Sequence, residues 1–154
     1  MTTCNDAKIQ DKEGNAWLYS DIVKEHFFHP HNILLNSQDF DLAEYYEGRV
    51  GSPACGDEMV IWIKVDPSAD AQGKSRIVDC KWQTFGCGSA IASTSILSDM
   101  VLENDGMSID DAMKIKPQDI TDRLGGLPAR KIHCSVLGDQ ALQLAIKNWE
   151  KDNV

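Results

Sequence analysis

Two runs of residues in the middle of the chain have a strand pattern with a period of two, and they limit its fold more than any other feature. In the first, EMVIWIKVD at residues 58–66, one face carries Met59, Ile61, Ile63 and Val65, and the other carries Val60, Trp62 and Lys64. In the second, RIVDCKWQT at residues 76–84, one face carries Val78, Cys80, Trp82 and Thr84. A period of two is typical of a β-strand. Because the intervening stretch, DPSADAQGKS, is rich in turn-forming residues, the two runs predict an antiparallel hairpin.

Helical patterns flank this hairpin. Ser20 is a suitable N-cap for a helix that ends before Pro30. The residues that recur at helical spacing within it are Ile22, Val23, His26 and Phe27. Further helices are predicted over residues 89–103, 108–114 and 117–124, and after Cys134, where the spaced positions are Leu137, Ala141, Leu144, Ala145 and Asn148. Residues 31–48 show no clear period and receive no assignment. Residues 1–16 are expected to form a polar, flexible leader.

The composition is that of a globular domain, since 42% of the 154 residues are hydrophobic and 25% are charged. The formal net charge of -9 would repel a phosphate backbone, so nucleic acid is not an expected partner. No apolar run approaches the roughly 20 residues that span a bilayer, so no membrane association is expected. The first residues show no targeting signal, and an odd number of irregularly spaced cysteines favours free thiols and a cytoplasmic location.

The hairpin brings two of the five cysteines into one candidate site. Cys55 precedes the first strand by three residues and Cys87 follows the second by three, and these ends are neighbours in an antiparallel pair. Both lie in glycine-containing corners, ACGD and GCGS, where the backbone can bend sharply. Cys87 and Cys134 each precede a predicted helix, where the helix dipole favours the thiolate. Thiolate is the form that binds metal.

Two further types of ligand lie beside these cysteines, the carboxylate of Asp57 and the imidazole of His133. Three sulfurs with a carboxylate and an imidazole suit iron-sulfur chemistry or zinc. The spacing contains no C-x-x-C pair, and on the residues alone the ordinary alternatives stay open: a buried cysteine, a turn carboxylate, and a capping or surface imidazole. Cys80 alternates with apolar residues of its strand and is interpreted as core, and Cys4 receives no role.

Four long stretches together resemble the IscU/NifU family of iron-sulfur cluster assembly scaffolds in order and spacing, over about residues 17–150: YSDIVKEHFFHPHN (19–32), GSPACGDEM (51–59), QTFGCGSAIASTS (83–95) and GGLPARKIHCSVLGDQALQLAI (125–146). The resemblance implies an α+β fold, with a small three-stranded antiparallel sheet and helices packed on it, in a single domain over residues 17–154. It also implies an assembly scaffold and sulfur acceptor, not an enzyme. Such a scaffold holds a transient [2Fe-2S] cluster before transferring it to acceptor proteins.

The resemblance also assigns residues and partners. The implied cluster-binding residues are Cys55, Asp57, Cys87, His133 and Cys134. Either Asp57 or His133 would be the fourth ligand or a neighbour that controls lability, Cys134 is the implied persulfide acceptor, and Lys131 matches the family lysine before the last cysteine. Implied partners are a cysteine desulfurase, an iron donor or frataxin-like regulator, a ferredoxin electron donor, and acceptor apo-proteins or carriers. Zinc in cluster-free protein and a homo-oligomer are also compatible with the resemblance.

The chain departs from the family pattern at several positions. The segment LPARK carries Ala129 where relatives often have a second proline, in a site that an Hsp70-type chaperone recognises, and this weakens the expectation of that partner. The first predicted helix is followed by HPHN, where an arginine is common. The leader with Cys4 has no counterpart in the family pattern. Because the chain ends at Val154, a stand-alone scaffold is expected.

Two other functions remain open at this point. A zinc-dependent sulfurtransferase of the SufU kind uses the same cysteines, but such proteins carry an insertion between the second and third cysteines and lack the histidine. This chain has no obvious insertion there and retains His133 in KIHC. A structural zinc module would need metal in order to fold, whereas this chain has enough apolar residues to form a core without metal.

Overall fold

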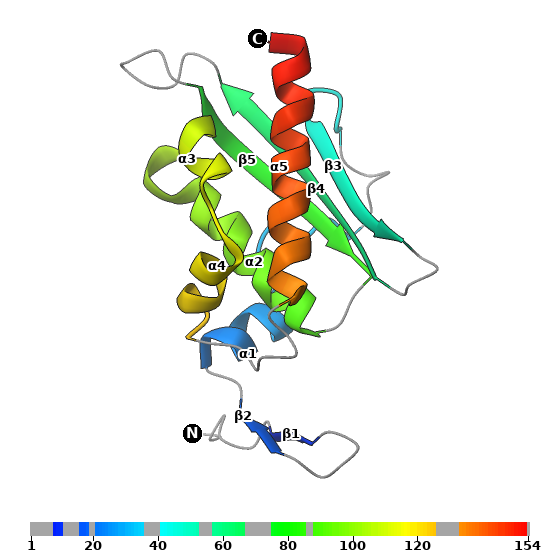
Figure 1. Cartoon of the computed structure of the whole chain (residues 1–154), viewed down its shortest axis with the longest axis vertical. Helices are drawn as coiled ribbons and strands as arrows, with labels where there is room; N and C mark the ends of the chain where they lie inside the picture. The colour runs from blue at the N-terminus through cyan, green and yellow to red at the C-terminus, as the bar shows by residue number, and fades with distance from the viewer. Residues whose placement is uncertain are drawn as a thin grey trace.

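The computed structural model describes residues 8–10, 16–18, 21–35, 41–52, 57–66, 75–85, 88–125 and 133–153. Its elements in chain order are β1 (Lys8–Gln10), β2 (Ala16–Leu18), α1 (Asp21–Phe28), β3 (Tyr46–Ser52), β4 (Asp57–Asp66), β5 (Arg76–Thr84), α2 (Gly88–Leu102), the short 3-10 helix η4 (Glu103–Asp105), α3 (Ile109–Met113), α4 (Pro117–Arg123) and α5 (His133–Asn153). Figure 1 shows a small sheet with α5 lying along it. The predicted α+β class is confirmed.

The main sheet is antiparallel, with the strand order β3-β4-β5. The predicted hairpin is confirmed, since β4 pairs with β5 and places Ile61 opposite Trp82. The third strand, β3, pairs with the other edge of β4 and places Gly48 opposite Ile61. β3 begins within the segment for which the sequence pattern gave no assignment. The family resemblance, not the alternation of residues, therefore predicted the three-stranded sheet.

A register shift in the hairpin changes which side chains of β5 face the core. Lys64 pairs with Asp79, but the next residue, Val65, pairs with Ile77, so the ladder skips Val78. An extra residue of this kind is a β-bulge, and it locally reverses the alternation of side chains. Ile77 is therefore fully buried and Val78 is 41% exposed. The prediction that Val78 shares a face with Cys80 and Trp82 is wrong at this one position.

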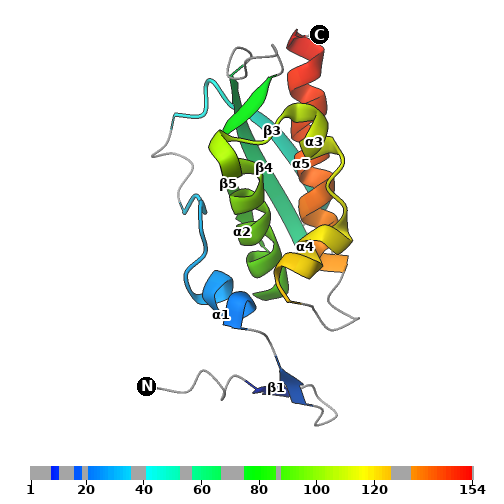
Figure 2. The ribbon, with the colours of Figure 1, turned by 90° about the vertical axis from the view of Figure 1, so that its left-hand side faces the viewer.

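Each face of the sheet contacts different parts of the chain. α5 packs on β3 and β4, and α2 packs on β5 and along α5 (Figure 2). The main core lies between this helical layer and the face of β4 that carries Met59, Ile61 and Ile63. On the opposite face a smaller cluster contains Leu34, Val60 and Trp62, with Leu42 and Tyr45 packed against it. Burial on both faces explains why the middle of β4, from Met59 to Ile63, is apolar at every position.

The predicted helices are confirmed, although α5 begins at His133 and so includes Cys134, and Ser20, the expected cap of α1, lies outside the described residues. The Ser108 hydroxyl accepts a hydrogen bond from the backbone N–H of Asp111 at 3.2 Å and caps α3. Pro117 occupies the first turn of α4, where its missing N–H costs nothing. In α1 the buried face contains Val23 and His26, whereas the predicted core positions Ile22 and Phe27 are 43% and 39% exposed.

Two short strands precede α1. β1 and β2 pair antiparallel, with Ile9 opposite Trp17, in a separate two-stranded sheet. This pairing crosses the expected boundary between a leader at residues 1–16 and a domain at residues 17–154, and the polar composition of the leader does not indicate it. Among the helices of the described ranges, none has both the length and the apolar character that a membrane span requires.

Burial of Asp139 on α5 should make the stability of the protein depend on pH. The residue is 7% exposed, and burial, together with the nearby charge of Asp119, raises the pKa of its carboxyl to about 6, although a hydrogen bond from Gln143 opposes the shift. Because the folded pKa lies above the unfolded value, the carboxyl favours folding only while it is protonated. This contribution is present below about pH 4 and is lost as the pH rises through about 6.

We therefore expect Asp139→Asn to raise the free energy of unfolding at pH 7.5 by on the order of 1–3 kcal/mol and to change it little at pH 4. Urea unfolding at both pH values measures the difference. Asp152→Asn is the matched control, because Asp152 is exposed near the end of the same helix and should have a small effect at either pH. An equal change at pH 4 and pH 7.5 would show that ionisation of Asp139 is not the cause.

Candidate functional site

The structure describes the backbone at three of the predicted site residues. Asp57 is the first residue of β4, and His133 and Cys134 are the first two residues of α5. The other predicted site residues, Cys55, Cys87 and Lys131, lie outside the described residues, as do Cys4 and Ala129. The ligand assignments therefore stay predictions, and the structure bears on the chain segments that flank them.

The start of β4 and the end of β5 are adjacent. Asp57 pairs with Ser52 on one side of β4, and Met59 pairs with Thr84 on the other. One residue beyond β5, the backbone N–H of Phe85 donates to the carbonyl oxygen of Glu58 at 3.0 Å. The pairing of strand ends that underlies the predicted approach of Cys55 and Cys87 is thus confirmed.

α2 and α5 meet beside this end of the sheet. The hydroxyl of Thr94, on α2, donates to the sulfur of Met59, on β4, at 3.4 Å. A Cβ atom added to Gly138, on α5, would lie 3.4 Å from the same Thr94 hydroxyl. Figures 1 and 2 show the first turns of α2 and α5 at the same end of the molecule as the start of β4. Segments far apart in the sequence therefore converge where the cysteine set is predicted.

Helix dipoles add an electrostatic argument for this position. α5 contains 21 residues, and His133 and Cys134 occupy its first turn. α2 contains 15 residues and begins at Gly88, directly after Cys87. The positive end of a helix dipole stabilises a thiolate relative to a thiol. These two helix starts are consistent with the prediction that Cys87 and Cys134 bind metal as thiolates.

Cys80 has the opposite environment. Its side chain is 1% exposed within the main core, as its strand pattern predicted. Burial, reinforced by the neighbouring carboxylate of Asp79, raises the pKa of the Cys80 thiol to about 12. A thiol of this kind stays protonated near pH 7 and is a poor metal ligand.

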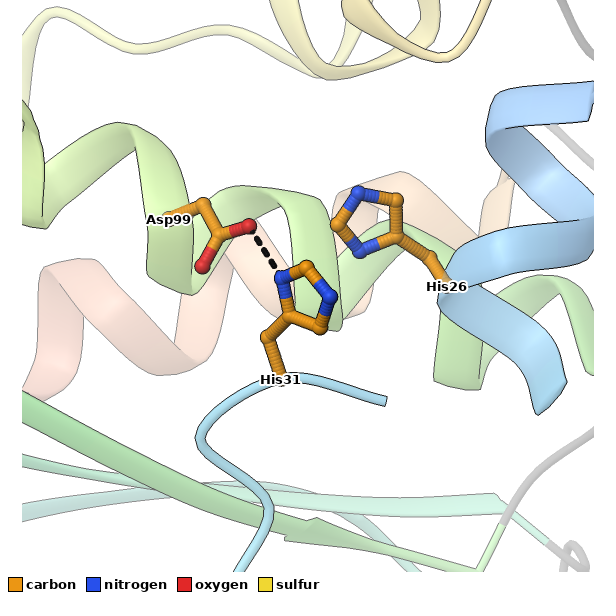
Figure 3. Close-up of side chains that lie close together, drawn as sticks. All are labelled: His26, His31 and Asp99. Atoms are coloured by element: carbon orange, nitrogen blue, oxygen red, sulfur yellow. Dashed lines mark hydrogen bonds and ion pairs between the residues drawn. The ribbon is translucent and has the colours of Figure 1, made fainter. Parts of the chain in front are cut away.

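A second cluster of potential ligands lies between α1 and α2, and the sequence analysis did not identify it. It comprises His26 on α1, His31 in the segment after α1, and Asp99 on α2 (Figure 3). His31 Nδ1 lies 2.5 Å from Asp99 Oδ2, and the two imidazole centroids are 4.5 Å apart. No periodic pattern in the sequence joins these residues, because α1 ends between His26 and His31, and Asp99 follows His31 by 68 residues. The HPHN departure from the family pattern was the one available signal.

Hydrogen bonds hold this cluster in place. His26 Nδ1 lies 2.6 Å from the hydroxyl of Ser95, which also accepts the backbone N–H of His31 at 2.8 Å. The side-chain amide of Asn32 donates to Asp99 Oδ1 at 3.1 Å. Burial lowers the pKa of His26, and the adjacent His31 lowers it further, while carboxylates nearby oppose these effects in part. The lowered pKa favours the neutral imidazole of His26 near pH 7.

Comparisons with known proteins find one matching family and several similar proteins. Residues 18–154 match the family described as "NifU-like N terminal domain". The nitrogen fixation protein NifU of Azotobacter chroococcum is 44% identical over 138 residues, which cover 90% of this chain and 40% of that protein. The iron-sulfur cluster assembly scaffold protein IscU of Aquifex aeolicus is 41% identical over 85% of this chain and 75% of its own length.

A second IscU protein and one solved structure are also similar to this chain. A protein of Drosophila melanogaster named iron-sulfur cluster assembly enzyme IscU is 42% identical over 86% of this chain and 79% of its own length. The chain spans only 40–42% of the NifU proteins that it matches. Among solved structures, the crystal structure of a hypothetical protein has a TM-score of 0.54 and 24% identity, and it covers 82% of this chain and 94% of its own. This likeness supports the fold.

Proposed function

Because the chain belongs to the family of NifU-like N-terminal domains, we propose that it is a scaffold on which an iron-sulfur cluster is assembled and from which the cluster passes to acceptor proteins. The names of its relatives from Azotobacter chroococcum and Aquifex aeolicus support this function. The observation that carries it is the convergence of the start of β4, the end of β5 and the N-terminal halves of α2 and α5. The cluster is the cargo of this protein, and its proposed form is [2Fe-2S].

The proposed ligands are the thiolates of Cys55, Cys87 and Cys134, with Asp57 or His133 at the fourth position. This donor set fits an iron-sulfur cluster, because such clusters are held mainly by thiolates and accept a nitrogen ligand at one iron. Lys131, shortly before α5, supplies a positive charge in the sequence neighbourhood of the last two donors. In cluster-free protein the same thiolates and imidazole suit zinc.

Sulfur would arrive by exchange between cysteines. In this proposal the thiolate of Cys134 attacks the outer sulfur of a persulfide on a cysteine desulfurase, a new sulfur–sulfur bond forms, and the desulfurase cysteine leaves as a thiolate. Conversion of that sulfur to sulfide needs electrons, for which a ferredoxin is the proposed donor, and iron comes from a separate donor. The protein acts as acceptor and scaffold throughout. The first turn of α5 suits this role because it favours the thiolate of Cys134.

Asp57 has a specific proposed role in release of the cluster. A carboxylate prefers harder cations than thiolates do, so a cluster corner that it holds can open to a thiol of an acceptor. We expect Asp57→Ala to assemble a cluster on the three cysteines with His133 or an outside thiol, but to transfer it to an apo-ferredoxin at least about tenfold more slowly. Time courses of transfer from folded protein with matched cluster loading measure this rate.

The matched control for this experiment is Asp66→Ala. Asp66 is the last residue of β4, so the control removes a carboxylate from the opposite end of the same strand. Its transfer rate should equal that of the unmodified protein. If Asp57→Ala transfers its cluster as fast as the control or faster, the role of Asp57 in release is wrong.

A further inference from the structure

The cluster of His26, His31 and Asp99 lies outside the proposed cysteine set and shares no residue with it. We propose that these three side chains form a second metal site, which binds a single divalent transition-metal ion such as Zn²⁺ or Fe²⁺ between α1 and α2. The inference rests on the geometry of the three side chains and does not depend on the function proposed above.

The first argument is the distance between donors. One potential ligand atom from each residue lies within 4.8 Å of the other two. Ligand atoms at about 2.1 Å from a tetrahedral ion are about 3.4 Å apart, so movements of about 1 Å complete the site. The more distant donors move closer together, and His31 Nδ1 and Asp99 Oδ2, now 2.5 Å apart, separate to admit the ion. The side chains of His31 and Asp99 are 41% and 33% exposed, which leaves them room to adjust and gives an ion access from solvent.

The second argument is that the surrounding hydrogen bonds already orient the donors. The Ser95 hydroxyl contacts the His26 ring, and the amide of Asn32 holds one oxygen of Asp99. The other oxygen, Oδ2, lies 2.5 Å from His31 Nδ1, and this contact between two proposed ligands is the one that a bound ion would replace (Figure 3). The contacts from Ser95 and Asn32 remain as hydrogen bonds from outside the ligand set. Outer hydrogen bonds of this kind are typical of metal sites, because they fix the orientation of imidazole and carboxylate ligands.

The donor types determine which ions suit the site. Two imidazole nitrogens and one carboxylate oxygen match Zn²⁺, Fe²⁺ and related ions, whereas Ca²⁺ and Mg²⁺ prefer oxygen ligands alone. Glu25 Oε1 lies 3.9 Å from His31 Nε2 and adds a second carboxylate on the exposed side. Two carboxylates close to two imidazoles favour a cation electrostatically. Three protein ligands leave at least one position for water.

An ion at this site would link separate segments of the chain. His31 lies in the segment that runs along the edge of β5. There the indole N–H of Trp82 donates to the backbone carbonyl oxygen of His31 at 2.8 Å. Asp99 is on α2, one turn after Ser95, and the neighbouring Thr94 contacts Met59 at the start of β4. The ion would therefore brace α1 and α2 against each other next to the end of the sheet where the cysteine set is proposed.

Zinc binding to a chain with Cys55→Ser, Cys87→Ser and Cys134→Ser tests the proposal without interference from the thiolates. After circular dichroism confirms folding, equilibrium dialysis should show one Zn²⁺ per chain. Cobalt should give visible bands without the intense sulfur charge-transfer bands of thiolate ligation. Adding His31→Asn or Asp99→Asn should weaken zinc binding at least about tenfold, whereas Mg²⁺ should not compete.

His29→Asn is the matched control, because the His29 side chain is 74% exposed and contacts Glu25 but is not a member of the cluster. Its zinc affinity should equal that of the parent chain. In the chain with its native cysteines, ring-nitrogen NMR signals of His26 and His31 should shift on zinc addition, and those of His29 should not. The proposal is overturned if the cysteine-substituted chain takes up no zinc, or if His31→Asn and Asp99→Asn bind it as tightly as the control.

Discussion

Gly48→Ala should destabilise the protein by about 3 kcal/mol, the upper part of the range for overpacking in a tightly packed core. Gly48 lies in β3, and a Cβ atom on it would lie 1.9 Å from the carbonyl oxygen of Ala141 and 2.6 Å from the backbone nitrogen of Ala145. Both atoms belong to the backbone of α5, so no side-chain rotation relieves the contact. Either α5 must move away from the sheet or β3 must distort, and both changes open the main core.

Urea unfolding followed by circular dichroism measures this loss. Gly138→Ala is the matched control, because a Cβ atom there would meet Leu97 and Thr94 at 3.4 Å, the distance of an ordinary contact. Alanine is favoured over glycine inside a helix by about 1 kcal/mol, so this control should leave stability unchanged or raise it slightly. If Gly48→Ala is as stable as the parent protein, the close packing of α5 on β3 is wrong.

The same glycine explains why the sequence did not predict β3. An edge strand that carries Gly48 and Gly51 among polar residues has no apolar alternation, and glycine itself disfavours strands. The sequence pattern was sufficient to predict β4 and β5, because both strands bury many of their side chains. β3, the strand that the sequence pattern indicates least clearly, is therefore the strand on which α5 packs most closely.

Local patterns also failed where tertiary contacts decide the outcome. The bulge that exposes Val78 arises from the pairing of two strands, and nothing in the run at residues 76–84 marks it. The cluster of His26, His31 and Asp99 depends on the packing of α1 against α2. By contrast, the core position of Cys80 followed from alternation alone, because it lies in a regular part of the ladder. The hairpin predicts only that Cys55 and Cys87 lie close together, and the family resemblance adds Cys134 to the predicted set.

Serine in place of Cys55, Cys87 or Cys134 should reduce cluster binding by more than about tenfold. A hydroxyl is a much weaker ligand for iron than a thiolate, and it stays protonated near pH 7. Each substitution removes one of the thiolates on which the proposed site depends, so the other donors cannot hold a stable cluster. Visible absorption after anaerobic reconstitution with iron, sulfide and a thiol measures the loss.

Cys80→Ser is the control for these substitutions. Its side chain is 1% exposed, so a buried hydroxyl without a partner should cost about 1–3 kcal/mol of stability. The variant should nevertheless bind the cluster with an unchanged spectrum, because Cys80 lies in the core as a protonated thiol. Loss of the cluster from folded Cys80→Ser would contradict the division of the cysteines into ligands and core.

The most direct test of the proposed function is a metal and sulfide analysis of the unmodified protein after anaerobic reconstitution with iron, sulfide and zinc together. The scaffold function predicts bound acid-labile sulfide with at least an equal amount of iron, a brown colour, and bleaching in air as the cluster is lost. Protein that binds only zinc at the cysteines, contains no acid-labile sulfide and never develops a visible chromophore would contradict it.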